Sequence, residues 1–482
     1  MAQHIIFGET PSQGLSDSKW SGILGSFAAL VGIDFHSQPG TIKVQQKLTK
    51  ESETTVDALC RVRIALSEGT SLWFSYTTGK IWYRSSGGTW TLVYTTSPAT
   101  GAAGCLGAEE FDGFVYWATQ SRLHRIATTA TLSTAAGWNA GVSINWATFT
   151  NTQASYHPMQ KQNLQLFIGD KNYVAKVSGA TGSHAFTANA LDIRQPLIIK
   201  TMIDFDIDIL IGTYVADTVN KTEVIRWDTE ASSWDSSDPI EENGINAFLR
   251  DDNYVYAQCG KAGRFYLYNG EQLVPFKRIP GTWSPTQTAE VYPQAVGTLL
   301  TIPVFGLSNV AGNPTNQGVY SLGSYSKDYP KIMDLSYPIS DGVLTTMEVG
   351  AILVMGADML VSWKNGSSFG VDKLDYTAKY ASAYIETKML TPAGARGMLK
   401  SVSSVFINYI TLPASTAISI KYKTKHDASF SAAMNQVDDT NLFQIRSDEV
   451  IPNIAALQLR FDFTVSSNNA PEVESIGYVD NQ

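Results

Sequence analysis

The sequence predicts an all-β protein: a β-propeller of about seven blades followed by a C-terminal β-sandwich. Three observations predict this fold. A short strand signal recurs along the chain, a second strand signal precedes each copy, and windows with helical apolar spacing and caps are nearly absent. A strand-filled period of roughly 40–50 residues is typical of propeller blades.

The recurring signal is a triplet whose outer residues are mostly apolar. Its seven copies are Ile81–Tyr83, His124–Ile126, Ala175–Val177, Ile225–Trp227, Tyr266–Tyr268, Tyr320–Leu322 and Val361–Trp363. The steps between their last residues are 43, 51, 50, 41, 54 and 41, with a mean of about 47. A propeller by itself implies no chemistry, so function has to be sought on loops and surfaces.

Each triplet follows a second strand signal at a distance of a few residues. These signals are Leu72–Tyr76, Val115–Thr119, Leu164–Ile168, Asp208–Gly212, Tyr254–Gln258, Leu300–Val304 and Ile352–Gly356. Turn residues such as Thr77–Gly79 separate the pairs and predict β-hairpins. Flanking apolar runs such as Leu59–Leu66 can complete a blade to four strands. A large array of β-sandwiches with accidental spacing is the alternative.

The chain is expected to divide at residues 50 and 378. Residues 1–50 form a leader whose Thr41–Val44 is a plausible strand for closing the propeller, which occupies 51–378. In residues 379–482 the strand period continues but the blade spacing ends, which favours a β-sandwich. Its expected strands are Tyr384–Met389, Val402–Tyr409, Ala417–Lys423, Leu442–Arg446 and Leu457–Phe463.

Composition excludes several classes of partner. The 482 residues carry a net charge of −9 and no run of five Lys or Arg residues, so sequence-specific nucleic-acid binding is not expected. The longest apolar stretch, Ile23–Ile33, has eleven residues, too few to cross a bilayer. A membrane-active Trp20–Phe35 is the alternative to packing against the propeller rim.

Cysteine is scarce in the chain. Cys60, Cys105 and Cys259 are too far apart for a disulfide framework, which favours a reducing cytoplasm as the place of synthesis.

Catalytic and cofactor motifs are missing from the sequence. There is no Gly-rich phosphate loop, no G-x-S-x-G elbow and no H-E-x-x-H, and no cofactor is expected. The histidines lack ligand spacing; they are His4, His36, His124, His157, His184 and His426. Ser85–Trp90 resembles the Asp-box of sialidase-type propellers without its Asp, and Asp228–Trp234 is a looser echo. That motif is a hairpin turn, and a sialidase would also need an arginine cluster with a Tyr/Glu pair.

Asp204, Asp206 and Asp208 alternate with Phe205 and Ile207. Strand alternation would place the three carboxylates on one face, where they could hold Ca²⁺. A solvated strand face without metal is the preferred interpretation, because no glycine-containing calcium loop follows.

Several phrases resemble the opening and tail of tailed-phage virion proteins with β-propellers. They are Gly32–Val44, Gly79–Arg84 with Gly87–Trp90, and the C-terminal Tyr384–Thr387, Val405–Ile407, Leu412–Pro413 and Ile418–Lys423. The architecture is also similar to the propeller nozzle proteins of short-tailed phages. The resemblance implies a virion protein made in the host cytoplasm and carries over no catalytic residue.

The leading hypothesis is therefore a non-enzymatic structural protein of the phage tail or neck. It would assemble in several copies and present propeller loops to neighbouring virion proteins, to passing DNA or to the host. The alternative is a receptor- or carbohydrate-binding module, with Trp138 and Trp146 as faces for stacking sugars. A propeller glycosidase or lyase is the third hypothesis.

Overall fold

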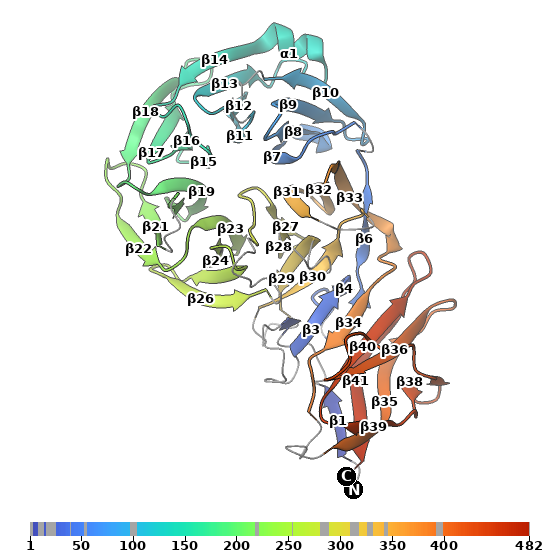
Figure 1. The fold of residues 1–482 in the computed structure, drawn as a ribbon. Helices are drawn as coiled ribbons and strands as arrows, with labels where there is room; N and C mark the ends of the chain where they lie inside the picture. Colours follow the sequence, from blue (N-terminus) through green and yellow to red (C-terminus); the bar gives the residue numbers. More distant parts are fainter. Residues whose placement is uncertain are drawn as a thin grey trace.

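The chain folds as an all-β protein that contains a β-propeller (Figure 1). The computed structural model describes residues 3–7, 14–15, 26–38, 40–52, 55–96, 104–216, 221–252, 254–279, 289–308, 318–324, 331–341, 346–391 and 399–481. Within these ranges α1 (Ala135–Gly141) is the one α-helix. No helix in them has the length and hydrophobicity needed to cross a membrane.

Consecutive strands form the first three blades, each an antiparallel four-stranded sheet. The first contains β7 (Cys60–Ala65), β8 (Ser71–Ser75), β9 (Lys80–Arg84) and β10 (Trp90–Thr95). The second contains β11 (Gly107–Phe111), β12 (Phe114–Ala118), β13 (Arg122–Ala127) and β14 (Val142–Thr148). The third contains β15 (Met159–Gln162), β16 (Gln165–Asp170), β17 (Tyr173–Ser178) and β18 (Ala185–Asp192).

Three further units continue in the same strand order. One contains β19 (Ile198–Phe205), β20 (Asp208–Tyr214), β21 (Thr222–Trp227) and β22 (Ser236–Ile240), and the next β23 (Ile245–Asp251), β24 (Tyr254–Cys259), β25 (Arg264–Tyr268) and β26 (Leu273–Arg278). Then follow β27 (Val296–Leu299), β28 (Ile302–Leu307), β29 (Gly318–Gly323) and β30 (Ile332–Pro338). The last blade combines β31 (Met347–Met355), β32 (Asp358–Asn365) and β33 (Ser368–Lys379) with β6 (Gln46–Lys50) from the leader.

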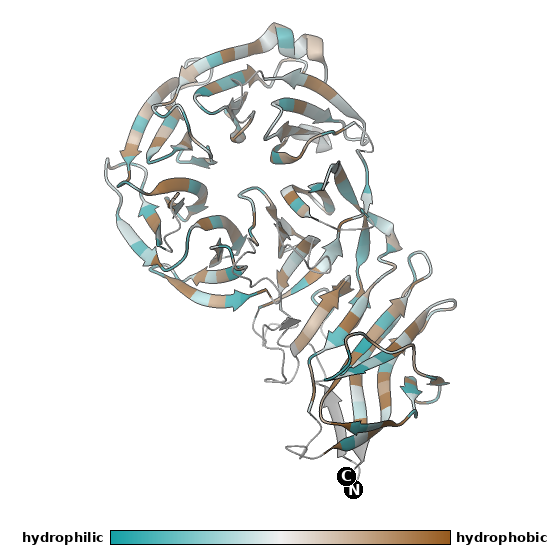
Figure 2. Cartoon of the chain, viewed as in Figure 1, coloured by the Kyte–Doolittle hydropathy of each residue, from teal (hydrophilic) through white to brown (hydrophobic). Residues whose placement is uncertain are grey.

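The first strand of each unit lies nearest the propeller axis (Figure 1). Each of these inner strands contacts the next, and β31 returns to contact β7, so the ring is closed. Apolar and polar residues alternate along many strands (Figure 2), and the apolar ones pack between neighbouring sheets. Phe74, Trp117 and Trp138 fill one such layer between the first two blades.

The predicted count of about seven blades differs from the six four-stranded sheets that stand alone. The departure falls on the longest repeat, the one between Tyr268 and Leu322. There β27 to β30 do not form a separate sheet, because Val31 of β3 (Ser26–Val31) pairs with Leu335 of β30 in a parallel bridge. The four strands are thereby the first part of a nine-stranded sheet.

The strand that completes the last blade is β6, so the choice of Thr41–Val44 for this role was wrong. β6 pairs antiparallel with β33, and its Leu48 is buried in the propeller core. β5 (Ile42–Val44) instead pairs with β4 (Ile33–Asp34) and β41 (Glu472–Asn481). Ile42 and Val44 are buried in the C-terminal core. β5 shows the stronger apolar–polar alternation, whereas β6 has one apolar residue, Leu48, so the sequence pattern pointed to the wrong strand.

Two sheets make up the C-terminal part. The nine-stranded sheet continues from β3 through β34 (Tyr384–Thr387) and β40 (Leu457–Thr464) to β36 (Ala417–Thr424), with β2 (Gly14–Leu15) beside β3. An eight-stranded sheet runs β37 (Val437–Asp439), β38 (Gln444–Ser447), β35 (Lys400–Thr411), β41, β5 and β4; β1 (Gln3–Phe7) joins β41 and β39 (Ile451–Ile454) joins β35. One buried cluster contains side chains from both sheets, such as Ile385 and Val405. The domain boundaries at residues 50 and 378 stay predictions.

Leader residues thus belong both to the last blade of the propeller and to the two C-terminal sheets. Residues 26–31 of the proposed membrane-active stretch form β3, whose Phe27 and Leu30 are buried in the C-terminal core. This part of the stretch packs inside the protein; Trp20 to Gly25 lie outside the described residues.

Candidate functional site

Charged and aromatic side chains converge around the propeller axis, where the inner strands begin. We call this group the axial cluster; it consists of Arg61, Tyr76, Tyr156, Lys200, Tyr292 and Glu348. Alternation along the inner strands explains how it arises. In β7, Cys60 and Val62 are buried between sheets while Arg61 is turned toward the axis. The cluster combines residues from most of the units of the ring.

One half of the cluster is centred on Glu348 of β31. The Arg61 guanidinium donates to Glu348 Oε2 at 2.9 Å and to the Tyr292 hydroxyl at 2.7 Å. The Tyr292 hydroxyl donates to Glu348 Oε2 at 2.8 Å, and Lys364 Nζ donates to Glu348 Oε1 at 3.0 Å. Arg61 also lies over the rings of Tyr76 and Tyr292, at 4.3 and 3.9 Å. Hydrogen bonds between ionised groups, such as those of Arg61 and Lys364 with Glu348, are stronger than hydrogen bonds between neutral groups, and the stacked rings add cation–π attraction.

The other half is centred on the buried Lys200 of β19. Its Nζ donates to Asn246 Oδ1 at 2.6 Å and to Glu290 Oε2 at 3.2 Å. The same ammonium lies 5.1 Å from the ring centre of Tyr156. Lys200 therefore links the fourth unit of the ring to the units on either side of it.

Burial and hydrogen bonds together set the protonation of the acidic groups in the cluster. Burial acts to raise the pKa of Glu348, but hydrogen bonds from Lys364, Tyr292 and Arg61 outweigh it and lower this pKa, so the carboxylate is ionised. Burial raises the pKa of Tyr292 and of Tyr156, which keeps both phenols protonated. A weakly basic carboxylate and a protonated phenol are a poor general base and nucleophile at neutral pH.

The space left between these side chains is about 70 Å³. Sites that hold small-molecule ligands usually have roughly 300–1,000 Å³. One layer further along β7, Arg63 Nε donates to the Ile352 carbonyl at 2.9 Å, so this inward arginine is also held by the protein. The geometry favours a cluster that connects the inner strands of the blades to one another.

Asp204, Asp206 and Asp208 do not share a strand face. β19 ends at Phe205 and β20 begins at Asp208, and Asp206 has a positive φ of 60° in the hairpin turn between them. The Asp204 and Asp208 carboxylates pair with Arg250 and Arg226, both at 2.5 Å. Among the described residues no group of three His, Cys, Asp or Glu is arranged to hold a metal ion. The expectation of one strand face with three carboxylates was wrong.

The two tryptophans proposed as stacking faces differ. Trp138 of α1 has no exposed surface: it stacks on Tyr94, and its Nε1 donates to the Leu132 carbonyl at 2.8 Å. Trp146 is half-buried, with the Arg125 guanidinium 4.4 Å from its ring centre. Trp138 therefore cannot stack on a sugar.

The Asp-box echo, the cysteines and two of the histidines have structural roles. Ser85–Thr89 forms the turn between β9 and β10, as expected for the Asp-box echo, and Ser85 Oγ accepts from the Thr89 amide at 3.0 Å. The three cysteines are buried and free, and burial raises their pKa values. His36 and His184 each pair with an aspartate, Asp334 and Asp112, at 2.8 Å. Sequence reasoning missed the axial cluster, because inward-facing strand residues look like solvent-facing ones.

No family model and no curated protein matches the chain. Solved structures with a similar fold include the extracellular domain of a hybrid two-component system from B. thetaiotaomicron (11% identity, TM-score 0.46), and the alignment covers 77% of this chain and 44% of that one. Virginiamycin B lyase from Staphylococcus aureus has 12% identity and a TM-score of 0.47, with 68% and 98% covered. The Dos1 propeller has 9% identity and a TM-score of 0.42, with 69% and 95% covered. Sequence identities and TM-scores this low allow no activity or partner to be transferred from these proteins to this chain.

Proposed function

We propose that the chain is a non-enzymatic structural protein of a bacteriophage virion, in the tail or neck, which assembles in several copies. The resemblance to phage virion propellers supports this proposal. Two of its phrases fall on β9 and the turn that leads into β10; the others fall on β4 and β5, on β34, on the centre of β35 with the loop after it, and on β36, that is, mostly on the two C-terminal sheets. The C-terminal part is therefore the part of the chain we assign to assembly.

We count β27 to β30 as a seventh blade and treat the two C-terminal sheets as a β-sandwich. The four strands are consecutive and antiparallel, and β27 contacts β23 and β31 in the inner ring. The sandwich assignment rests on the buried cluster to which both sheets contribute. The nine-stranded sheet then connects the seventh blade directly to the sandwich. Such a continuous sheet would suit a virion protein that has to withstand mechanical force between neighbouring virion proteins.

The observation that carries the assembly role is a set of exposed apolar side chains at one edge of the C-terminal part. Leu442 and Phe443 are 60% and 58% exposed, and Val437 of β37 and Ile410 of β35 have about half of their surface in solvent. The Tyr409 amide donates to the Phe443 carbonyl at 2.8 Å, which places this turn against the end of β35. β37 is a strand of three residues at the edge of its sheet, where it pairs with β38 on one side. Exposed apolar groups beside a sheet edge favour association.

The test replaces Leu442 and Phe443 together by Ser in the full chain. We expect the purified double variant to keep its melting temperature but to lose concentration-dependent assembly in mass photometry. Antibody labelling of virions in negative stain should detect the parent protein at the tail or neck of the phage that encodes it. Virions made with the double variant should carry no label. Leu164→Ser is the matched control, because Leu164 is 93% exposed on the propeller. Normal incorporation of the double variant would refute the role of this edge, and absence of the parent protein from particles would refute the virion role.

A propeller glycosidase is the second candidate, and the Tyr292–Glu348 pair with Arg61 is the observation that favours it. This is the kind of pair that a sialidase-type site requires, although one arginine replaces a cluster. Burial of Tyr292, which is 2% exposed, and the small cavity argue against it. Release of sugar from sialylated or uronic-acid glycans that Tyr292→Phe abolishes, with the fold intact, would establish this activity; we expect no turnover by the parent protein.

A further inference from the structure

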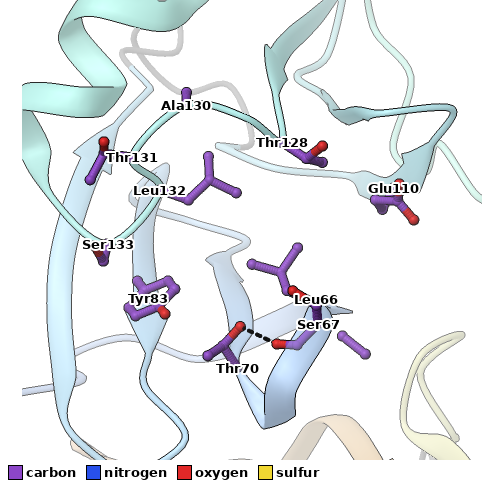
Figure 3. A pocket seen from close by; sticks show the side chains of 11 residues that line it. Leu66, Ser67, Thr70, Tyr83, Glu110, Thr128, Ala130, Thr131, Leu132 and Ser133 are labelled. Atoms are coloured by element: carbon purple, nitrogen blue, oxygen red, sulfur yellow. Dashed lines mark hydrogen bonds between the residues drawn. The ribbon is translucent and has the colours of Figure 1, made fainter. Parts of the chain in front are cut away.

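A second cavity, of about 530 Å³, opens between the first two blades. It lies where β7 and β11 end, whereas the axial cluster lies where the inner strands begin. Figure 3 shows its side chains around one space, with Thr128 and Glu110 on one side and Tyr83, Thr131 and Ser133 on the other. The volume is within the range of sites that hold small-molecule ligands.

Hydroxyl groups dominate the wall of this cavity. They belong to Ser67, Thr70, Tyr83, Thr128, Thr131 and Ser133. Leu66 and Leu132 supply an apolar surface that is continuous with the core between the two blades. A wall that alternates hydroxyls with small apolar patches matches a ligand that itself has hydroxyls on its rim and C–H groups on its faces.

The polar groups of the wall are only partly satisfied by the described part of the chain. Thr70 Oγ1 donates to the Ser67 carbonyl at 2.8 Å, and Thr128 Oγ1 donates to the Gly113 carbonyl at 3.0 Å. Both hydroxyl oxygens can still accept a hydrogen bond. The side chains of Tyr83, Glu110 and Ser133 take part in no hydrogen bond or ion pair there. These three groups remain available to a ligand.

Glu110 gives the cavity its charge. It is the one carboxylate among the eleven lining residues, and none of them is cationic. Its neighbour Glu109 is engaged, because Lys161 Nζ lies 3.0 Å from its Oε1. A free carboxylate can accept hydrogen bonds from two adjacent ligand hydroxyls, and such bonds are stronger than neutral ones. An anionic ligand would meet this charge without a counter-ion.

We propose that this cavity binds one neutral sugar residue. Glu110 and the hydroxyls of Ser133 and Thr131 bond the rim of the ring, while Tyr83 and Leu132 pack against a face of it. Choline-like cations would need several aromatic rings around them, and Tyr83 is the one aromatic residue in the lining. The site is separate from the assembly edge and would give the particle contact with a glycan.

The test titrates the full-length protein with free sugars and follows binding by saturation-transfer NMR and calorimetry. The neutral probes are glucose, galactose, N-acetylglucosamine and N-acetylgalactosamine. Glucuronic acid and N-acetylneuraminic acid are the anionic probes, and choline is the cationic one. We expect millimolar binding of at least one neutral sugar, with the anionic probes and choline at least tenfold weaker.

Two variants place the binding in this cavity. Glu110→Gln should weaken the neutral sugar at least fivefold, and Ser133→Trp should abolish binding by filling the space. Glu109→Gln is the matched control on the same strand and should leave affinity unchanged. The proposal is wrong if no neutral probe binds, if an anionic sugar or choline binds best, or if Glu110→Gln and Ser133→Trp bind as the parent does while their melting temperatures are unchanged.

Discussion

Two of the joints between residues distant in sequence, the propeller closure and the junction with the C-terminal part, are built differently. At the propeller closure, β6 pairs with β33 through five residue pairs, from Lys50 with Asp372 to Gln46 with Lys379. At the junction with the C-terminal part, β3 and β30 share one residue pair, Val31 with Leu335, and the Gly32 amide donates to the Leu335 carbonyl at 2.8 Å. The closure is a backbone ladder, whereas the junction depends more on side chains.

Those junction side chains are polar and buried. His36 Nε2 lies 2.8 Å from Asp334 Oδ1, and Ser336 Oγ donates to Asp334 Oδ2 at 2.6 Å. Gly323 makes room for the imidazole, since a Cβ there would collide with the His36 ring. Burial raises the pKa of Asp334, and His36 opposes this rise. Leu48 at the closure and the His36–Asp334 pair at the junction thus each hold two distant segments together. Because one is apolar and the other is a hydrogen-bonded polar pair, we expect substitutions at the two joints to destabilise the fold to different extents.

The largest effect is expected at the closure, from Leu48→Asp. Leu48 is buried in the propeller core, and an unpaired carboxylate there should lower the free energy of unfolding by ~4 kcal/mol or more. Thermal unfolding followed by circular dichroism should show that Leu48→Asp melts at a lower temperature than the parent protein or has no cooperative transition. Lys47→Ala is the control, because Lys47 is 40% exposed on the opposite face of β6. Equal melting temperatures for the two variants would show that β6 is not needed to close the ring.

A pH dependence is expected at the same joint, from Asp372 of β33. Burial raises its pKa from 3.8 to about 6, although the Ser340 amide and hydroxyl and the Trp363 indole donate to its oxygens. The folded state therefore binds more protons than the unfolded state between pH 4 and 6, and stability falls as pH rises through this window. The difference corresponds to ~3 kcal/mol at 1.36 kcal/mol per pKa unit.

Asp372→Asn removes this titration. The stability of the parent relative to the variant, measured by urea unfolding, should therefore decrease between pH 4 and pH 7 by up to ~3 kcal/mol. A difference that stays constant over this range would contradict the raised pKa.

At the junction, Gly323→Ala should have a moderate effect. The new methyl group must displace the His36 ring from Asp334, and overpacking of this kind costs ~1–3 kcal/mol. The NMR signal of the His36 imidazole should shift as the hydrogen bond to Asp334 breaks. Gly87→Ala, in a hairpin turn with room for a Cβ, serves as the control and should change neither quantity. An unchanged His36 signal in Gly323→Ala would mean that the pair does not depend on this glycine.

The smallest effect is expected from Lys43→Ala. Lys43 Nζ lies 2.9 Å from Glu472 Oε1 between β5 and β41, and both side chains are partly exposed. Solvent and salt screen such pairs, so the loss should stay below ~1 kcal/mol and shrink further in 0.5 M salt. A loss larger than that of Gly323→Ala would show that surface charges, and not buried groups, hold this region together.

The repeat was predictable because each unit buries both faces of its middle strands. Six triplets fall on the third strand of their unit, as Ile81–Tyr83 does on β9, whereas Val361–Trp363 falls on β32, the second strand of the last blade. Second and third strands are buried alike, so an apolar pattern does not distinguish them. The axial cluster depends on residues brought together by closure of the ring, such as Arg61 and Glu348, and no local pattern marks them. The cavity between the first two blades is lined by residues from Ala65 to Ser133, which come together when these two consecutive blades pack.

The strand order has a consequence for synthesis of the protein. β5 pairs with β4 on one side and with β41 on the other, and β3 pairs with β34, so the propeller is inserted between strands of one C-terminal core. About 340 residues separate Val44 from Tyr384. At roughly 5–20 residues per second, the early strands wait tens of seconds on the ribosome before their partners emerge. Phe27, Leu30 and Ile33 therefore reach their places in the C-terminal core only after nearly the whole chain has been made.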